Sequence, residues 1–168
     1  MIPLLRDARP EDIETVRAIE RASARRFIGL MDDLAEDDPT PTPVLAARLA
    51  AGGLLTASID HTLAAFVMFR PVEDSLYVEQ IDVLPAFAGQ RIGARLLDAV
   101  SDKARAQGLS ALTLSTFRDV PWNASWYRRL GFVDIAEDRL TPGLLDIRHE
   151  HLARGLDESQ RVFMARLA

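Results

Sequence analysis

The stretch that decides the fold is IDVLPAFAGQRIGARLL, residues 81–97. A strand-like run ends at Val83, and Pro85 stops further pairing because proline has no backbone N–H to donate. Gly89 and Gly93 omit side chains where the chain turns from a loop into a helix. The free N–H groups of such a first turn carry the positive end of the helix dipole, so the junction suits a phosphate or pyrophosphate. A tight connection without a ligand is the alternative interpretation.

The junction matches neither of the two commonest nucleotide-binding loops. A Walker loop requires Lys and then Ser or Thr after its last glycine, whereas Gly93 is followed by Ala94 and Arg95. The dinucleotide fingerprint requires a third glycine and an acidic residue at the end of the next strand. We therefore expect a phosphate site of another class.

The rest of the chain alternates strand and helix patterns around this junction. Strands are expected at residues 3–6, 54–59, 62–70, 75–83, 111–116, 132–137 and 161–167, and helices from residue 10 and at 43–51, 89–107, 123–130 and 144–154, with a loop at 29–43. Antiparallel hairpins precede a strand–helix–strand crossover, an order that predicts one α/β domain over residues 1–168.

Composition excludes several classes of protein. The chain has 168 residues, 48% of them hydrophobic, which suits one globular domain and excludes a disordered chain. The absence of Cys removes disulfides, thiolate metal sites and thiol nucleophiles, and three His residues do not favour a metal site. A net charge of −5 argues against nucleic-acid binding. No apolar run of bilayer length and no signal-peptide pattern is found, so we expect a cytoplasmic protein without a membrane partner.

A second motif, NASWYRRLGF at residues 123–132, follows the long expected helix and the next strand. Together with V-x-P and G-x-x-I-G-x-x-L-L in the decisive stretch, it resembles the GNAT N-acyltransferase family, and the resemblance covers the whole chain. Two departures stand out. Ala88 replaces a family Gln or Arg, and Arg91 replaces the first glycine of the family loop. Backbone N–H groups tolerate both changes, and Arg91 adds a positive charge.

The resemblance implies a mixed, mostly antiparallel sheet flanked by helices, with two central strands that splay apart. It also implies acetyl-coenzyme A as co-substrate, with no metal. Its pyrophosphate is expected on the loop of Gly89, Gln90, Arg91, Ile92, Gly93 and Ala94, and its pantetheine arm on the backbone of Ile81 and Val83 and on the side chain of Asn123. Tyr127 is then the general acid at the thioester sulfur, and Glu79 the general base.

The chemistry of thioester aminolysis tests these two roles. A phenol of pKa about 10 protonates a thiolate of pKa about 8.5 at a cost of roughly 2 kcal/mol, which a strong hydrogen bond can offset. A Glu side chain with a pKa of about 4.3 takes a proton from a Lys-like ammonium only at a cost of about 8 kcal/mol. From an α-ammonium the cost is about half as large. We therefore expect Glu79 to orient and relay rather than to act as a strong base. Strand alternation places Asp82 on the face away from Glu79.

The expected function is transfer of an acetyl group from acetyl-CoA to a primary amine by direct attack in a ternary complex. The alternative is a non-catalytic acyl-CoA binding or sensing module on the same fold. A longer acyl donor or a hydroxyl acceptor also stays open. The acceptor is expected to be a small-molecule or peptide amine, and a homodimer is common in the family.

Each site residue has a structural alternative. Tyr127 fits a core aromatic, Glu79 a carboxylate without chemistry, and Asn123 a helix N-cap. His149 and His151 fit a helix surface better than a metal site. The acidic run at residues 32–38 offers a weak attraction for a cationic amine.

Overall fold

In the computed structural model, residues 2–31 and 37–168 are described. The chain divides into two compact units. The first comprises Met1–Arg70 and Glu79–Ala99, and the second comprises Pro71–Val78 and Val100–Ala168. The single domain expected over residues 1–168 stays a prediction.

The strands are β1 (Leu4–Asp7), β2 (Leu54–Ile59), β3 (Thr62–Val72), β4 (Ser75–Val83), β5 (Ala111–Phe117), β6 (Val133–Asp134) and β7 (Arg161–Leu167). They form one sheet in the order β1-β2-β3-β4-β5-β7-β6. The pairs β1–β2, β2–β3, β5–β7 and β6–β7 are antiparallel, and β4–β5 is parallel. The expected α/β fold with a mixed, mostly antiparallel sheet is confirmed.

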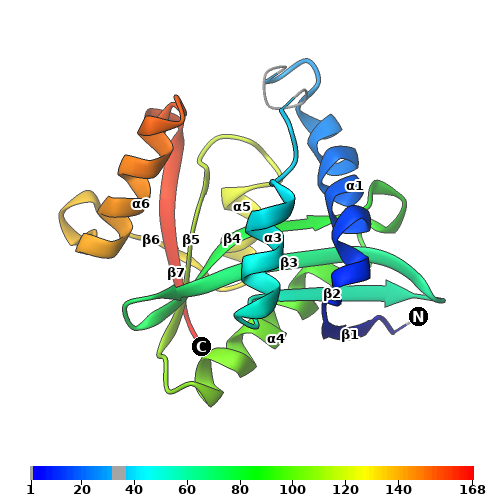
Figure 1. Ribbon diagram of the computed structural model, residues 1–168. Helices are drawn as coiled ribbons and strands as arrows, with labels where there is room; N and C mark the ends of the chain where they lie inside the picture. The colour runs from blue at the N-terminus through cyan, green and yellow to red at the C-terminus, as the bar shows by residue number, and fades with distance from the viewer. Residues whose placement is uncertain (1, 32–36) are drawn as a thin grey trace. The chain divides into compact units, whose positions relative to one another are not determined.

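The helices are α1 (Ile13–Ala24), α3 (Thr42–Ala50), α4 (Ile92–Ala106), α5 (Ala124–Arg129) and α6 (Pro142–Ala153) (Figure 1). Short 3₁₀ turns lie at η1 (Pro10–Asp12), η2 (Arg25–Phe27), η3 (Pro85–Phe87), η4 (Glu137–Arg139) and η5 (Glu158–Gln160). The helix expected from residue 10 thus begins with a 3₁₀ turn. Among the described segments, no helix is long and apolar enough to cross a bilayer.

The strand expected at residues 132–137 is largely wrong, since β6 has only two residues. Ile135 still donates its N–H to the Phe163 carbonyl over 2.8 Å, but η4 then begins at Glu137. The chain therefore leaves the sheet edge early, although its residues have strand-like composition.

The first unit is built on the β2–β3 hairpin, which α1 and α3 cover (Figure 1). Asp60 and His61 form its turn with φ of 49° and 66°, the left-handed pair that suits a tight hairpin. The core between helices and strands consists of Ile13, Val16, Ile19, Leu45, Leu54, Phe66 and Met68. α1 and α3 thus share one core cluster.

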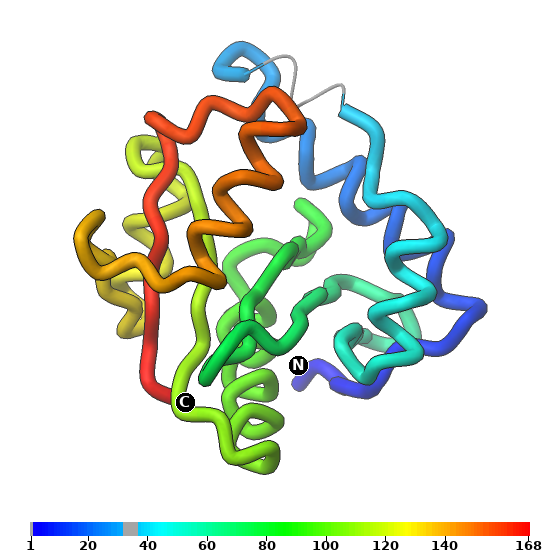
Figure 2. The backbone as a smooth tube through the Cα atoms, turned by 60° about the vertical axis from the view of Figure 1, so that its left-hand side comes forward, coloured from blue at the N-terminus to red at the C-terminus, as the bar shows by residue number. Residues whose placement is uncertain are grey.

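The second unit is built on β5 and β7, which run side by side from Ala111↔Leu167 to Phe117↔Arg161 (Figure 2). On its other edge β5 pairs in parallel with β4, from Ser75↔Ala111 to Val78↔Leu114. α6 packs on this part of the sheet through a core cluster of Val72, Tyr77, Leu144, Ile147 and Phe163. The residues Val100–Ala168 of this unit also include α5, which carries the second motif.

Candidate active site

The loop before α4 has the backbone shape expected of a phosphate-binding turn. Gly89 has φ of 79° and Arg91 has φ of 62°, both in the left-handed region. Glycine is favoured in this region because other residues carry a Cβ that crowds the backbone. Arg91 therefore has a backbone conformation that favours glycine, and its side chain is exposed. α4 begins directly afterwards at Ile92, so the N–H groups of its first turn follow the loop.

The remaining loop residues divide between anchors and exposed positions. Ile92 and Ala94 are buried, so only their backbone is available to a ligand. Gln90 is exposed, and Gly93 is buried without a side chain. Ile81 and Val83, on the last part of β4, are half-buried.

Glu79 on β4 is held by two arginines of the first unit. Both of its oxygens accept from Arg48 of α3, Oε1 from Nε in a short contact and Oε2 from Nη2 over 2.9 Å. Arg70 Nε lies 3.3 Å from Oε2. The carboxylate is thus a fixed acceptor whose charge is compensated on two sides.

Asp82, three residues further along β4, has neutral partners. Its Oδ1 accepts from Ser23 Oγ of α1 over 2.9 Å, and its Oδ2 accepts from Gln80 Nε2 over 2.7 Å. Its carboxyl group is enclosed by neighbouring atoms, although the residue keeps some exposed surface. Burial raises the pKa of Asp82 to about 7, against the opposing effect of the two hydrogen bonds.

The expected separation of Glu79 and Asp82 onto opposite faces is wrong. Glu79 contacts α3 and Asp82 contacts α1, two helices that share one core cluster. Strict two-residue alternation therefore does not hold along this part of β4, and both carboxylates face the same helical layer.

Asn123 stands at the N-cap of α5, but its side chain makes no capping hydrogen bond. Its Nδ2 is buried and has no hydrogen-bond partner. A buried N–H donor without an acceptor costs about 1–3 kcal/mol, so such an atom calls for a partner. The capping role considered for Asn123 is wrong, whereas the donor is available to a ligand carbonyl.

Tyr127 follows one turn later, and its backbone N–H donates to the Asn123 carbonyl over 3.1 Å. The side chain is 8% exposed. Its ring makes edge contacts with Trp126 and Phe132, at centroid distances of 4.9 and 5.6 Å. The aromatic neighbours fix the ring, so both the structural and the catalytic interpretation of this tyrosine fit its packing.

Several functional candidates have no signal in the sequence. Arg48 and Arg70 are two basic residues among 20, and only the fold shows that they meet one carboxylate. His149 is exposed as expected, whereas His151 is partly buried and bonds to Glu158, so a surface position is wrong for His151. No three His, Cys, Asp or Glu side chains within the described ranges are grouped as metal ligands would be. Most of the acidic run at 32–38 falls outside the described residues.

Three similarities bear on the fold. PaiA N-acetyltransferase from Thermoplasma acidophilum, solved with coenzyme A, is 18% identical with a TM-score of 0.76, and the match covers 100% of both chains. A GNAT acetyltransferase from Brucella melitensis, solved with acetyl-CoA, is 24% identical with a TM-score of 0.58, over 79% of this chain and 83% of the other. An IAA acetyltransferase from Azospirillum brasilense is 44% identical over 57 residues, 34% of this chain and 37% of that protein's length.

The structural similarities show the fold, and the Azospirillum relative matches only about a third of the chain. The assignment to a family comes from a broader match. The model of the acetyltransferase (GNAT) family matches residues 15–132, which include the loop before α4 and both Asn123 and Tyr127. The chain therefore belongs to the acetyltransferase (GNAT) family.

Proposed function

We propose that this protein transfers an acetyl group from acetyl-CoA to a primary amine, by direct attack of the amine within a ternary complex. Membership of an acetyltransferase family supports the reaction class. The absence of Cys supports direct transfer, since the usual thiol nucleophile of an acyl-enzyme is missing. A bond forms between the amine nitrogen and the acetyl carbon, the carbon–sulfur bond breaks, and the thiolate takes a proton.

The residues present fit coenzyme A. The observation that carries the proposal is the buried, unpartnered Nδ2 of Asn123, which is suited to donate to a carbonyl of the pantetheine arm. The left-handed loop at Gly89 and Arg91, followed by the N–H groups of α4, is suited to bind the pyrophosphate. The backbone of Ile81 and Val83 is proposed to pair with the arm, beside the expected splay of β4 from β5.

Tyr127 and Glu79 are proposed to move the protons. Tyr127 donates its phenolic proton, or a strong hydrogen bond, to the departing thiolate. Glu79 orients and relays the proton that the amine loses. Its two arginine partners hold both oxygens in one place, which supports the orienting part of this role.

The test is Tyr127→Phe, followed by thiol release from acetyl-CoA with a library of amines. Loss of a general acid is expected to lower kcat about 100-fold or more. Tyr77→Phe is the matched control, since Tyr77 is the other buried tyrosine of the second unit. An unchanged kcat in Tyr127→Phe at neutral and alkaline pH contradicts the general-acid role.

A binding experiment separates the enzyme from a non-catalytic acyl-CoA module. Coenzyme A at about 100 times its Kd is expected to stabilise the protein by about 2.7 kcal/mol in thermal unfolding. Asn123→Ala is expected to reduce this stabilisation. Stabilisation without thiol release, for every amine tested, supports the binding module instead.

A further inference from the structure

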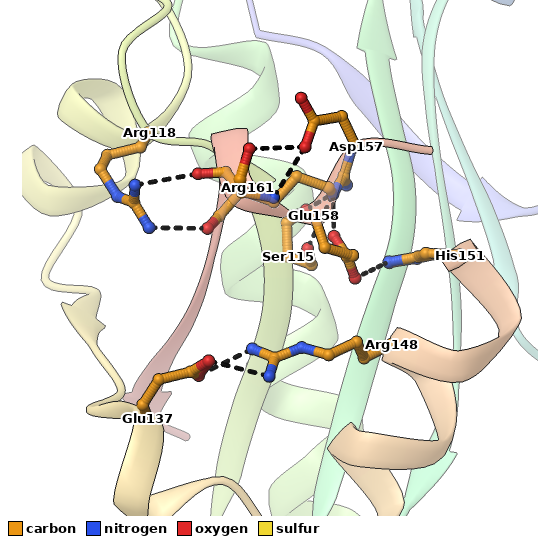
Figure 3. Close-up of polar contacts among 9 residues, drawn as sticks. Ser115, Arg118, Glu137, Arg148, His151, Asp157, Glu158 and Arg161 are labelled. Carbon is orange, nitrogen blue, oxygen red and sulfur yellow. Dashed lines mark hydrogen bonds and ion pairs between the residues drawn. The ribbon is translucent and has the colours of Figure 1, made fainter. Parts of the chain in front are cut away.

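A buried arginine stands at the start of β7, outside the residues given a role above. Arg161 Nε donates to Ser115 Oγ over 3.0 Å, and Nη2 donates to the Ser115 carbonyl over 3.1 Å (Figure 3). Its guanidinium carbon lies 4.8 Å from the centroid of the Phe117 ring, a cation–π contact. These contacts fix the orientation of the guanidinium. Burial lowers the pKa of this guanidinium.

A buried carboxylate lies beside this arginine. Glu158 Oε1 bonds to His151 Nδ1 over 2.8 Å, and Oε2 is 3.5 Å from Arg161 Nε. The side chains of Arg161, Glu158 and His151 are 16%, 10% and 13% exposed. Oε2 is buried without a hydrogen-bond partner. Arg161 Nη1 has no acceptor among the residues that the structure describes. The Oε2 acceptor and the Nη1 donor therefore belong to two side chains that contact each other through Oε2 and Nε, and neither atom makes a hydrogen bond of its own among the described residues.

The turn that carries Glu158 is fixed by its own hydrogen bonds, which Figure 3 draws beside the pair. Asp157 accepts from Ser159 N over 3.0 Å and from Gln160 Nε2 over 3.2 Å. Arg118 donates to the carbonyl oxygens of Ser159 and Arg161, over 3.1 and 3.0 Å. These hydrogen bonds hold the turn that carries Glu158 in one conformation. The position of its Oε2 atom is therefore set by an ordered turn.

The charges of the cluster add up to zero. Arg161 and Glu158 cancel, and burial lowers the pKa of His151, which keeps its ring neutral at pH 7. The nearby Arg148 is already paired with Glu137 through two hydrogen bonds of 2.9 and 2.7 Å. Arg154 is exposed to solvent. Because the cluster has no net charge, it cannot neutralise a ligand that carries a large net charge. A zwitterionic ligand has no net charge and needs no neutralisation.

The cluster belongs to the same unit as the proposed acid. Arg161 pairs with Phe117, the last residue of β5, and the chain continues from there into α5, which carries Tyr127. Tyr77 packs in the core cluster under α6 together with Phe163 of β7. The cluster is thus joined through β5 and β7 to the unit that carries the group assigned to the departing thiolate.

We propose that Arg161 and Glu158 recognise the acceptor, and that the acceptor is an amino acid or another small amine that carries a carboxylate. Arg161 Nη1 donates to that carboxylate, in a charge-assisted hydrogen bond. Glu158 Oε2 accepts from an N–H or O–H of the same molecule. This assignment rests on the proposed function, since it names the class of amine that receives the acetyl group.

The experiment compares amino acids with the amines that lack only the carboxylate: L-lysine with cadaverine, L-arginine with agmatine, and L-phenylalanine with phenethylamine. kcat and KM are measured by thiol release from acetyl-CoA. The wild type is expected to use at least one amino acid about tenfold better or more, in kcat/KM, than its decarboxylated partner. Arg161→Gln is expected to raise KM for that amino acid about tenfold and to leave the decarboxylated amine within about twofold.

Further variants separate recognition from folding. Arg148→Gln is the matched control, because Arg148 also lies over an aromatic ring, Phe163, and pairs with a carboxylate. It is expected to leave the acceptor preference unchanged. Arg161→Lys keeps the charge and is expected to recover part of the affinity. If Arg161→Gln does not fold, the assignment is tested by two other measurements. They are the ratio of kcat/KM for an amino acid and its decarboxylated partner in the wild type, and the same ratio in Glu158→Gln, which is expected to be smaller.

Two results overturn the assignment. One is a wild type that prefers the decarboxylated amines or peptides, and the other is an Arg161→Gln variant that loses activity equally on both members of a pair. Thiol release that is equal or faster with the amines that lack a carboxylate contradicts this assignment alone. Absence of thiol release with every amine contradicts the proposed acetyl transfer itself.

Discussion

The two carboxylates of β4 differ in how the fold treats their charge. Glu79 receives hydrogen bonds from Arg48 and an ion pair from Arg70, whereas Asp82 receives hydrogen bonds only from the neutral groups of Ser23 and Gln80. The carboxylate of Glu79 is thus a fixed acceptor between two guanidinium groups. A carboxylate that is buried among neutral donors changes its protonation within the physiological range, as the raised pKa of Asp82 indicates. Burial and partners, more than residue type, therefore decide what each carboxylate can do.

The largest effect is expected from Glu79→Gln. Loss of the relaying carboxylate is expected to lower kcat/KM about 100-fold. It also leaves Arg48 and Arg70 without their anion, so the melting temperature falls as well. Steady-state thiol release and thermal unfolding measure the two effects.

Asp82→Asn is the matched control for Glu79→Gln, since it neutralises the other carboxylate of the strand. It is expected to keep kcat/KM within about threefold of the wild type, because Asp82 is given no catalytic role. If Asp82→Asn loses as much activity as Glu79→Gln, the roles of the two carboxylates are exchanged.

A second, smaller effect concerns how the free energy of unfolding depends on pH. The folded-state pKa of Asp82 is raised to about 7, above that of the unfolded chain, so the wild type loses stability as the pH rises toward 7. Relative to Asp82→Asn, the wild type is expected to lose roughly 2 to 3 kcal/mol between pH 5 and pH 8. Urea unfolding at several pH values measures the difference. A difference that does not vary with pH contradicts the raised pKa.

The smallest effect is expected from Ser23→Ala. The lost hydrogen bond favoured the charged form of Asp82, so its removal raises the pKa of Asp82 further. The variant is expected to lose about 1 kcal/mol of stability at pH 8 and less at pH 5. In the Asp82→Asn background the pH dependence of the loss is expected to disappear. A double-mutant cycle in urea measures this coupling, and a loss of equal size in both backgrounds counts against it.

The sequence predicted the fold well where local rules decide it. The boundaries of β2, β4 and β7 were predicted to the residue, and the glycine-rich loop identified the family that the match over residues 15–132 confirms. Arg48 and Arg70 lack any local signal, since Glu79 does not neighbour either of them in the chain and arginine is spread over its whole length. Arg161 has Glu158 three residues before it, but its hydrogen-bond partner Ser115 is distant in the chain. The face of Asp82 was mispredicted because strict alternation ignores irregularity in a strand. The roles of Tyr127 and Glu79, a homodimer and the cytoplasmic location stay predictions.

The left-handed backbone of Arg91 lowers the stability of the fold, while its side chain adds a positive charge to the loop proposed to bind coenzyme A. A non-glycine residue in that conformation costs of order 1 kcal/mol or more, which Arg91→Gly recovers. The same change removes a positive charge from the loop proposed to bind the pyrophosphate. A chain selected only for heat resistance therefore gains from glycine here, whereas a chain that must load coenzyme A at low concentration gains from arginine.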